Sequence, residues 1–280
     1  MKKFGKIMVI VLALATLVGA CFAFTACNDK DTIVVYTNAF FAPFEYYEGT
    51  EIVGVDIDIM NKVGERMGRD VEFKNVDFGI IIDEVSSGKM CDVGAAGITW
   101  TEERAEKVAF SVPYYKSVQY VIFAEGSLPV SKNADGDDIV MWSALAGKKI
   151  GVQLDTTGDI YVGLEIDGEE GYTGAIQNTG ATKVQYKNAQ LAVESLGTQL
   201  DVVVVDELPA QYLTKNGNYV ALPLYYDAET ATEEEYCIAV NKGQTELLEN
   251  INAVLNEMMA ELNEDGDNAI EALVKQHFGL

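Results

Sequence analysis

The chain has 280 residues, 49% of them apolar and 23% charged, a composition typical of a folded protein with one or two domains. Acidic residues outnumber basic ones by 44 to 20, and the formal net charge is −24 at pH 7. A chain of this sign repels nucleic acid and anionic lipid surfaces, so we expect no nucleic-acid partner. The single histidine, His277, excludes a catalytic triad with histidine and a metal site with several histidines. We expect His277 in solvent near the end of the chain, and neither a metal nor a cofactor.

The first residues differ in character from the rest. A basic start with three lysines is followed by an uncharged apolar run over residues 7–20, and small residues then precede Cys21 and Cys27. This order is typical of a secretory signal peptide. A retained transmembrane anchor is the alternative, because the apolar run continues through Ala26. The basic flank and the small residues favour export.

A cysteine directly after small residues resembles a lipobox, in which the thiol receives a lipid and the peptide is cut before it. Cys21 follows Val-Gly-Ala, and Cys27 follows Phe-Thr-Ala and precedes a polar stretch. We expect a lipoprotein signal peptide over residues 1–26, lipidation at Cys27, and a tether over residues 27–31. The protein would then be a monomer held by its lipid on the extracytoplasmic face of the cell membrane.

Two further cysteines, Cys91 and Cys237, lie in the body of the chain. Export permits a disulfide, but two cysteines so far apart in sequence carry little information on proximity. We expect two buried thiols.

Strands and helices alternate in the first half. Short β-branched runs predict strands, and apolar periodicity that stops at glycine predicts helices. In chain order we expect a strand over 32–37, a helix ending at Gly68, a strand over 71–76, a helix over 79–87, a strand over 91–95 and a helical turn over 102–108.

The alternation restarts in the second half. We expect strands over 118–123, 149–152, 182–186, 202–205 and 237–240, and helices over 159–164, 189–196, 208–216, 247–262 and 268–278. Residues 127–138 read as a polar loop and residues 161–182 as a surface excursion. Two α/β halves indicate two lobes, and ligands of open α/β sheets bind beyond the carboxyl ends of the strands.

Several polar residues follow these strands directly. Gly97 allows close backbone approach, Thr99 supplies a hydroxyl group, and Arg104 offers a two-pronged guanidinium group for an anion such as a carboxylate. The other interpretation is a capped helix with a surface arginine. In the second half, Thr156 and Thr157 repeat this arrangement.

Three more residues have two interpretations each. Asp206 ends the apolar strand 202–205, where it is placed to hold an ammonium group or to cap the next helix. Phe41 and Phe78 follow the first and second strands, where they would enclose a ligand side chain or belong to the core.

The order of the motifs resembles the family 3 extracellular solute-binding proteins, the polar amino-acid receptors of ABC importers. The resemblance covers nearly the whole mature chain and is most specific at residues 96–104 (AGITWTEER) and 110–115 (FSVPYY). Residues 37–45, 53–58, 77–81, 147–153, 205–206 and 236–239 also match in order. The 77–81 segment resembles that of the glutamine receptors.

The resemblance implies an α/β, two-lobed type II periplasmic-binding-protein fold with a hinge of two crossing strands. Lobe 1 would comprise residues 32–114 and 236–280, and lobe 2 residues 115–235. The partners would be a free amino acid and an ABC permease with its ATPase.

The resemblance also implies residue roles. The ligand carboxylate would be held by Arg104, Thr99, Thr156 and Thr157, and the ammonium group by Gly97 and Asp206. Phe41 and Phe78 would sandwich the side chain, whose polar end would meet Asn38 and Gln153.

Three positions depart from the family pattern. Asn38 replaces a frequent aspartate, which weakens the case for a cationic ligand and favours a neutral polar one such as glutamine. Asp155 and Cys237 replace common glycines, which leaves the hinge detail open. The alternatives to transport are a dehydratase-like enzyme on the same scaffold and an amino-acid sensor module.

Overall fold

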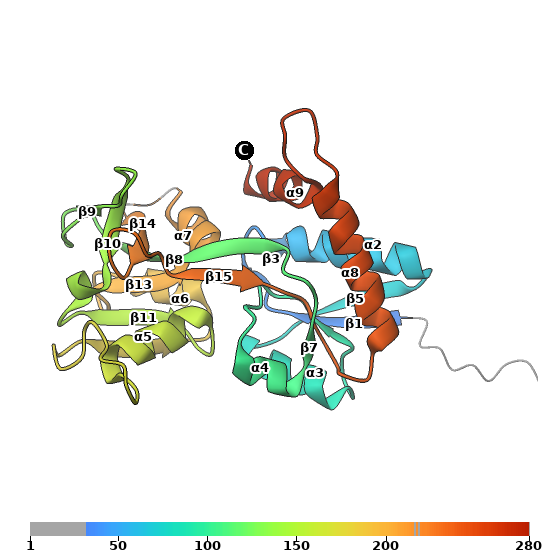
Figure 1. Ribbon diagram of the computed structural model, residues 1–280, viewed down its shortest axis with the longest axis horizontal. Coiled ribbons are helices and arrows are strands. Elements are labelled where there is room, and N and C mark those ends of the chain that lie inside the picture. Colours follow the sequence, from blue (N-terminus) through green and yellow to red (C-terminus); the bar gives the residue numbers. More distant parts are fainter. Residues whose placement is uncertain (1–31, 216, 218, 280) are drawn as a thin grey trace, which may run out of the picture. The chain divides into compact units, whose positions relative to one another are not determined.

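The computed structural model describes residues 32–215, 217 and 219–279, and the chain from Ile33 onward forms one compact unit (Figure 1). The predicted signal peptide and tether, with Cys21 and Cys27, lie outside the described residues. No helix among the described residues is long and apolar enough to cross a membrane.

Lobe 1 is the name used here for the five-stranded sheet and the elements around it. The strand order is β5-β1-β6-β16-β7, and β1 and β6 are parallel. The strands are β1 (Thr32–Thr37), β5 (Asp70–Asn75), β6 (Val93–Gly94), β7 (Ala109–Phe110) and β16 (Ala239–Val240). The helices are α2 (Val55–Met67), η1 (Phe78–Ile80), α3 (Ile81–Ser87), α4 (Glu102–Lys107), α8 (Thr245–Ala260) and α9 (Ala269–Phe278). A small sheet of β2 (Phe40–Phe41), β3 (Glu45–Glu48) and β4 (Glu51–Val53) completes this lobe.

Lobe 2 is the name for the eight-stranded sheet, in the order β12-β11-β13-β8-β14-β10-β9, with β15 paired to β8. Its strands are β8 (Tyr115–Ala124), β9 (Ser131–Lys132), β10 (Asp138–Met141), β11 (Lys149–Gln153), β12 (Thr182–Tyr186), β13 (Val202–Asp206), β14 (Tyr219–Tyr225) and β15 (Glu233–Tyr236). The helices are η2 (Trp142–Leu145), α5 (Thr157–Asp167), α6 (Ala189–Glu194) and α7 (Glu207–Thr214). β13 is buried along its whole length, as its apolar sequence predicts.

Two antiparallel strands connect the lobes. β8 carries the chain out of lobe 1, and β15 returns along it in the register Tyr236↔Tyr115 to Glu233↔Val118 (Figure 1). Beyond Tyr236 the chain enters β16 in the sheet of lobe 1. β15 therefore lies between the two lobes along the chain.

Several expectations from the sequence are corrected here. The hairpin β3–β4 and the strand β14 were not expected, and α5 continues to Asp167, so the excursion after it begins later than residue 161. β10 occupies the end of the expected polar loop. Strand pairing with β8 and β10 stabilises β14 despite its proline, Pro223.

His277 is not a solvated residue. Its side chain is 11% exposed, Nε2 lies 2.8 Å from Asp58 Oδ2, and Nδ1 lies 3.2 Å from the Tyr46 hydroxyl. The histidine therefore joins α9 to α2 and β3. Cys91 and Cys237 are both buried and not joined by a disulfide, as expected.

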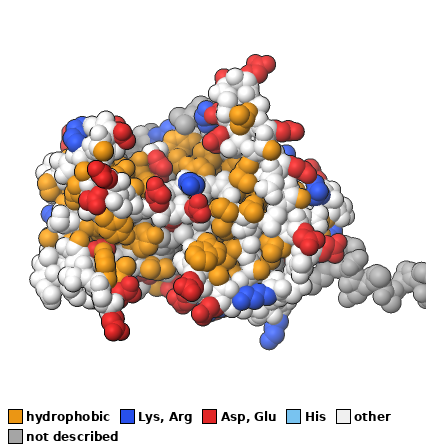
Figure 2. Space-filling view, viewed as in Figure 1, with side chains coloured by type: hydrophobic (Ala, Val, Ile, Leu, Met, Phe, Trp, Pro, Cys, Tyr) orange, Lys and Arg blue, Asp and Glu red, His pale blue; other side chains and the backbone are white. Residues whose placement is uncertain are grey.

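Acidic side chains are scattered over the face of the molecule shown in Figure 2, which accords with the negative charge of the chain. Apolar side chains lie between them, and the larger apolar residues of the core are buried beneath.

Candidate functional site

A narrow cavity of about 10 Å³ lies where strands of both lobes end. Asn38 follows β1, and Gly97 follows β6, whereas Gln153 and Asp206 end β11 and β13. Because β1 and β6 are parallel, as are β11 and β13, their carboxyl ends share one edge of each sheet. The lining residues are Asn38, Phe41, Glu45, Phe78, Ala96, Gly97, Thr99, Gln153, Thr156, Thr157 and Asp206. The structure thus brings together nine of the ten ligand-binding residues expected from the sequence.

Arg104 is the exception, since it lines an adjoining open hollow and not the cavity. Its Nη1 donates to the Thr99 carbonyl oxygen at 2.8 Å, and its Nη2 donates to the Asp155 carbonyl oxygen at 2.7 Å. The guanidinium carbon lies 5.6 Å from the ring centre of Phe78. Arg104 is 8% exposed, so it is not the surface arginine of the alternative interpretation. Burial lowers its pKa, and the charges of Glu234 and Asp206 oppose that shift.

The threonines connect the two lobes. Thr157 Oγ1 donates to Thr99 Oγ1 at 2.7 Å, and Thr99 Oγ1 donates to Glu234 Oε2 at 2.6 Å. Thr156 occupies the N-cap of α5 and donates to the Gln153 carbonyl oxygen at 2.7 Å. Thr101 caps α4, so the capped-helix interpretation holds for that residue.

Gly97 is held in a conformation that a side chain would disturb. Its φ is +54°, and an added Cβ would lie 2.9 Å from Cε1 of Phe41. Its N–H donates to Asp56 Oδ2 at 2.9 Å, which fixes the backbone at the cavity wall. Phe41 packs against Phe44 and Tyr236, with ring centres 6.2 and 6.4 Å away, so it belongs to both core and cavity.

Asn38 and Gln153 both line the cavity, and the part that they form is named here the distal end. Asn38 Nδ2 donates to the Val76 carbonyl oxygen at 2.6 Å, and Gln153 Nε2 donates to Asn38 Oδ1 at 3.1 Å. Gln153 Oε1 is buried without a hydrogen-bond partner among the described residues. The distal end therefore offers a neutral acceptor to a ligand that carries N–H groups.

Asp206 lines the cavity and Glu234 lies beside it; this part of the site is named here the ammonium end, after the group that Asp206 is expected to hold. Asp206 stands at the N-cap position of α7, but its side chain makes no capping bond. Instead, Tyr236 donates to Asp206 Oδ2 at 2.5 Å, and Gln119 Nε2 donates at 2.6 Å both to Asp206 Oδ1 and to Glu234 Oε1. Burial raises the pKa of Asp206 and, well above its usual range, that of Glu234.

Two further buried carboxyl groups lie close by. Glu45 lines the cavity, and its buried carboxyl group is in hydrogen-bond contact with the carboxyl group of Asp56. Burial, followed by the charges of Asp56 and Asp206, raises its pKa well above the usual range. Asp56 accepts from Tyr114 at 2.5 Å, and burial raises its pKa to about 6. The described part of the chain contains no group of three or more such side chains arranged for a metal ion.

Sequence reasoning assigned no role to Glu234, Gln119 or Glu45. A signal for Glu234 was present, because residues alternate in a strand and Tyr236 two positions on is fully buried. No such signal exists for Gln119, whose contacts depend on the pairing of β8 with β13 and β15.

Comparison with known proteins places this geometry in a family. The family model of bacterial extracellular solute-binding proteins, family 3, matches residues 33–279. The arginine-binding extracellular protein ArtP of Bacillus subtilis is 29% identical over 275 residues, which is 95% of this chain and 97% of that protein.

Solved structures agree with this relationship. An ancestral arginine-binding protein bound to glutamine is 34% identical, with a TM-score of 0.69 over 90% of this chain and 99% of that one. An ancestral amino-acid-binding protein described as a precursor of cyclohexadienyl dehydratase is 26% identical, with a TM-score of 0.69 over 89% and 96% of the chains. The expected two-lobed α/β fold of periplasmic binding proteins is thereby confirmed. The chain belongs to the family 3 bacterial extracellular solute-binding proteins.

Proposed function

We propose that this protein captures a free amino acid outside the cell and delivers it to the permease of an ABC importer with its ATPase. The observation that carries the proposal is the cavity with its buried carboxylate Asp206. No basic side-chain nitrogen of the described residues lies within 4.0 Å of that carboxylate. A buried carboxylate without a cation is costly, and the ammonium group of a ligand supplies the missing charge.

The opposite charge of an amino acid would be met by Arg104 and the threonines. Two of the guanidinium nitrogens already donate to carbonyl oxygens, one from each lobe, and the fork retains further N–H groups for a carboxylate. Thr99, Thr156 and Thr157 line the cavity beside it. Gly97 and Asp206 would hold the ammonium group, and Phe41 and Phe78 would enclose the side chain.

The side chain of the ligand would be neutral and polar, with glutamine preferred over arginine and lysine. Support comes from the distal end, where Asn38 and Gln153 present amides and Gln153 Oε1 is an unused acceptor. The amide N–H groups of glutamine match such an acceptor without a net charge that would require a carboxylate there. ArtP is named for arginine, and the ancestral protein is also named for arginine although its structure holds glutamine, so the preference for glutamine rests on these amides alone.

Ligand capture would proceed by closure of the lobes. Several hydrogen bonds already join them near the cavity, among them Arg104 to the Asp155 carbonyl oxygen, Thr157 to Thr99, and Gln153 to Asn38. A ligand that contacts both lobes stabilises the closed form, because only that form offers both sets of contacts. X-ray scattering with and without ligand measures this closure. Superimposable curves at saturation would contradict it.

The decisive test of function is a thermal-shift screen over the twenty amino acids. A cognate ligand at about 100 times its Kd adds about 2.7 kcal/mol of stability, a rise of roughly 5–10 °C in Tm. Matched controls are analogues of the best ligand that lack the α-carboxylate or the α-ammonium group, which should give almost no rise. If no amino acid raises the Tm, the proposed function is wrong.

A dehydratase-like activity is the second candidate, favoured by the buried acid Asp206 and by the likeness to the precursor of cyclohexadienyl dehydratase. An enzyme would consume its ligand, whereas a receptor returns it unchanged. NMR of the bound compound after prolonged incubation separates the two. Loss of the compound at a constant rate would support the enzyme.

We also propose that Cys27 carries a lipid that holds the protein on the extracytoplasmic face of the membrane. The sequence pattern of residues 7–27 supports this proposal. Cys27→Ser should release or misprocess the protein, whereas Cys21→Ser should leave it membrane-bound. Mass spectrometry that finds the lipid on Cys21 would reverse the assignment.

A further inference from the structure

Glu234 lies behind the proposed ammonium site and not on its surface. It belongs to β15, is 5% exposed, and accepts hydrogen bonds from Thr99 and Gln119, each at 2.6 Å. Both donors also contact other residues of the site, since Thr99 accepts from Thr157 and Gln119 donates to Asp206. Glu234 therefore acts on the cavity through its neighbours.

Asp206 and Glu234 form a carboxyl pair bridged by one amide nitrogen. Gln119 Nε2 lies 2.6 Å from an oxygen of each, so the two acids are close neighbours in a buried environment. In the described part of the chain, no basic side-chain nitrogen lies within 4.0 Å of either acid. The charge of Arg104 interacts with both acids, but its guanidinium group donates to carbonyl oxygens instead.

Two like charges in such a place cannot both persist without a cation. The other groups that face the pair do not relieve it: Tyr236 donates to Asp206 as a neutral phenol, Tyr161 contributes a neutral hydroxyl, and Glu45 is a further acid. Burial and the charge of Asp206 raise the pKa of Glu234, which agrees with a proton kept on the pair.

Resting on the proposed function, we propose that Glu234 is a positioning residue whose carboxyl group shares one proton with Asp206 in the empty site, and that binding of the α-ammonium group releases this proton. The O–H bond of the protonated carboxyl group breaks, and its electron pair stays on the oxygen, so that this group becomes a carboxylate. The proton passes to the buffer. The incoming ammonium group replaces the positive charge of the proton.

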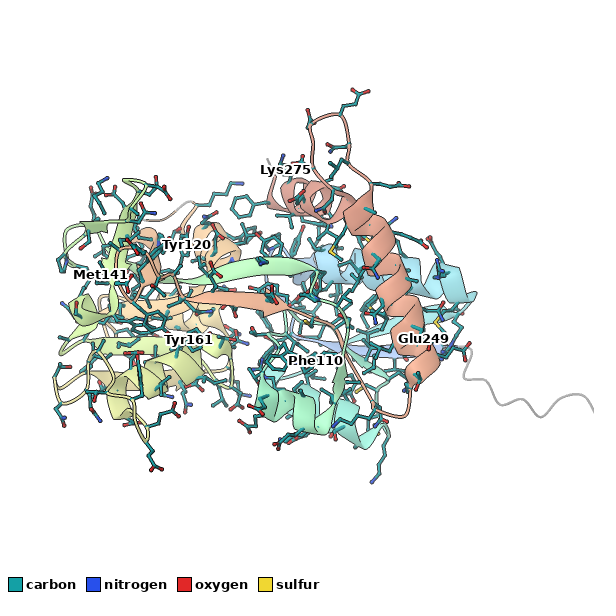
Figure 3. The ribbon with its side chains drawn as sticks, in the orientation of Figure 1. Phe110, Tyr120, Met141, Tyr161, Glu249 and Lys275 are labelled. Atoms are coloured by element: carbon teal, nitrogen blue, oxygen red, sulfur yellow. The ribbon has the colours of Figure 1, made fainter. Side chains whose placement is uncertain are left out.

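A route for the proton exists on the far side of Glu234. The side chain also lines an open hollow next to the hinge strands, together with Ser117, Tyr161 and Cys237. Tyr161 of α5 reaches toward β15, where its hydroxyl group donates to the Glu233 carbonyl oxygen at 3.4 Å (Figure 3). Glu234 thus separates the cavity from water that enters this hollow, and the proton can leave while the cavity is closed.

The direction of the pH dependence follows from linkage. Because the empty site binds one more proton than the filled site, affinity for an amino acid rises with pH wherever the pair is still protonated, by up to about tenfold per pH unit. The rise stops once the empty pair has lost its proton. An ordinary carboxyl group titrates near pH 4, so an affinity that rises between about pH 5 and pH 8 indicates that the pKa of the pair is raised.

Isothermal titration calorimetry on the wild-type protein tests this directly, with L-glutamine and L-arginine as probes. Titrations in buffers of different ionisation enthalpy count the protons released per ligand bound. We expect release of a substantial fraction of one proton in this pH range, and affinity that rises with pH. Measurable binding with no proton release at any pH would overturn the inference and leave the proposed function intact. Absence of binding by every amino acid would overturn both.

Three variants assign the proton. Glu234→Gln keeps the size of the side chain and removes the acid, so proton release and the pH slope should be lost. Glu233→Gln is the matched control, since Glu233 lies next to it on β15 with an exposed side chain, and it should behave as wild type. Glu45→Gln should also retain the release. Loss of release in Glu45→Gln with retention in Glu234→Gln would assign the proton elsewhere and contradict the inference. The wild-type titrations stand even if a variant does not fold.

Discussion

The two ends of the cavity differ in charge although both are buried. The ammonium end contains Asp206 and Glu234, with a shortage of positive charge, whereas the distal end contains Asn38 and Gln153, which are neutral. An unpaired buried charge costs far more than an unpaired buried amide oxygen. We therefore expect the ammonium end to supply most of the affinity and the distal end to choose among amino acids.

The two ends of the cavity also differ in how firmly their side chains are held. Each carboxyl oxygen of Asp206 and Glu234 accepts a hydrogen bond, so these acids are fixed before a ligand arrives. At the distal end, Gln153 Oε1 has no partner among the described residues. A preorganised charged end and an adaptable neutral end suit a receptor family whose members recognise a common backbone and different side chains.

The largest effect is expected from Asp206→Ala. Removal of the carboxylate leaves the ligand ammonium group buried without the carboxylate that it contacts, which costs roughly 2–5 kcal/mol and weakens binding about 30-fold to several thousand-fold. Calorimetric affinity for the best amino acid measures the loss. Glu233→Gln, an exposed acid on the hinge strand, is the control and should change little. Wild-type affinity in Asp206→Ala would remove this residue from the site.

Arg104→Ala should follow, with a loss near the lower end of that range, about 30-fold. Arg104 borders an open hollow of about 430 Å³, so water can partly solvate a carboxylate that loses its guanidinium partner. The matched control is Lys107→Ala, a cation on the same helix whose side chain is 46% exposed. If Arg104→Ala binds as tightly as wild type, Arg104 only joins the lobes through the Asp155 carbonyl oxygen.

Asn38→Asp tests the distal end and should change selectivity more than affinity. A carboxylate beside Gln153 would favour arginine and lysine over glutamine by about tenfold or more, because each 1.4 kcal/mol of differential interaction is a factor of ten. Competition between L-glutamine and L-arginine in the same calorimeter gives the ratio. Asn38→Ser, which removes the amide without adding charge, is the control. An unchanged ratio in Asn38→Asp would place the ligand side chain elsewhere.

Residue types at strand ends indicated part of the cavity with two interpretations for each residue, and the family resemblance supplied the choice and added Asn38 and Gln153. The apolar run of β13 ends at Asp206 next to parallel β11, and Gly97 follows β6 next to parallel β1, so each sheet presents its polar residues at one edge. The position of Arg104 could not be predicted in the same way, because its guanidinium group depends on the Asp155 carbonyl oxygen of the other lobe. Spacing along one helix contains no information on that partner.

There are also physical reasons why the sequence did not predict some of the strands. β14 contains Pro223 and no alternation of polar and apolar residues, so only its pairing with β8 and β10 defines it as a strand. The segment 233–235 consists of three glutamates, which by composition indicates a solvated surface. The middle one is nevertheless buried, because strand alternation places it on the same face as Tyr236.

The smallest effect is expected on the stability of the ligand-free protein, which should fall as pH rises from about 5 to 7. The carboxyl groups Asp56, Glu45 and Glu234 have raised pKa values in the folded state, so the folded protein binds more protons than the unfolded chain in this range. Unfolding then becomes easier as protons are removed. For Asp56, whose pKa is raised from 3.8 to about 6, the loss between pH 5 and pH 7 is about 1 kcal/mol.

Glu45→Gln sharpens this last prediction, because burial is the largest cause of the raised pKa of Glu45. An uncharged amide of the same size avoids the cost of ionisation, so the variant should melt at a higher temperature than wild type near pH 8 and at a similar temperature near pH 5. Glu233→Gln again serves as the control. Its side chain is exposed, so replacing the acid by an amide should leave the free energy of unfolding unchanged across this pH range. Melting curves of the three proteins without ligand across this pH range suffice. If wild type and Glu45→Gln lose stability in parallel, Glu45 is ionised in the folded protein, and the ammonium end would contain one more negative charge than the comparison of the two ends assumes.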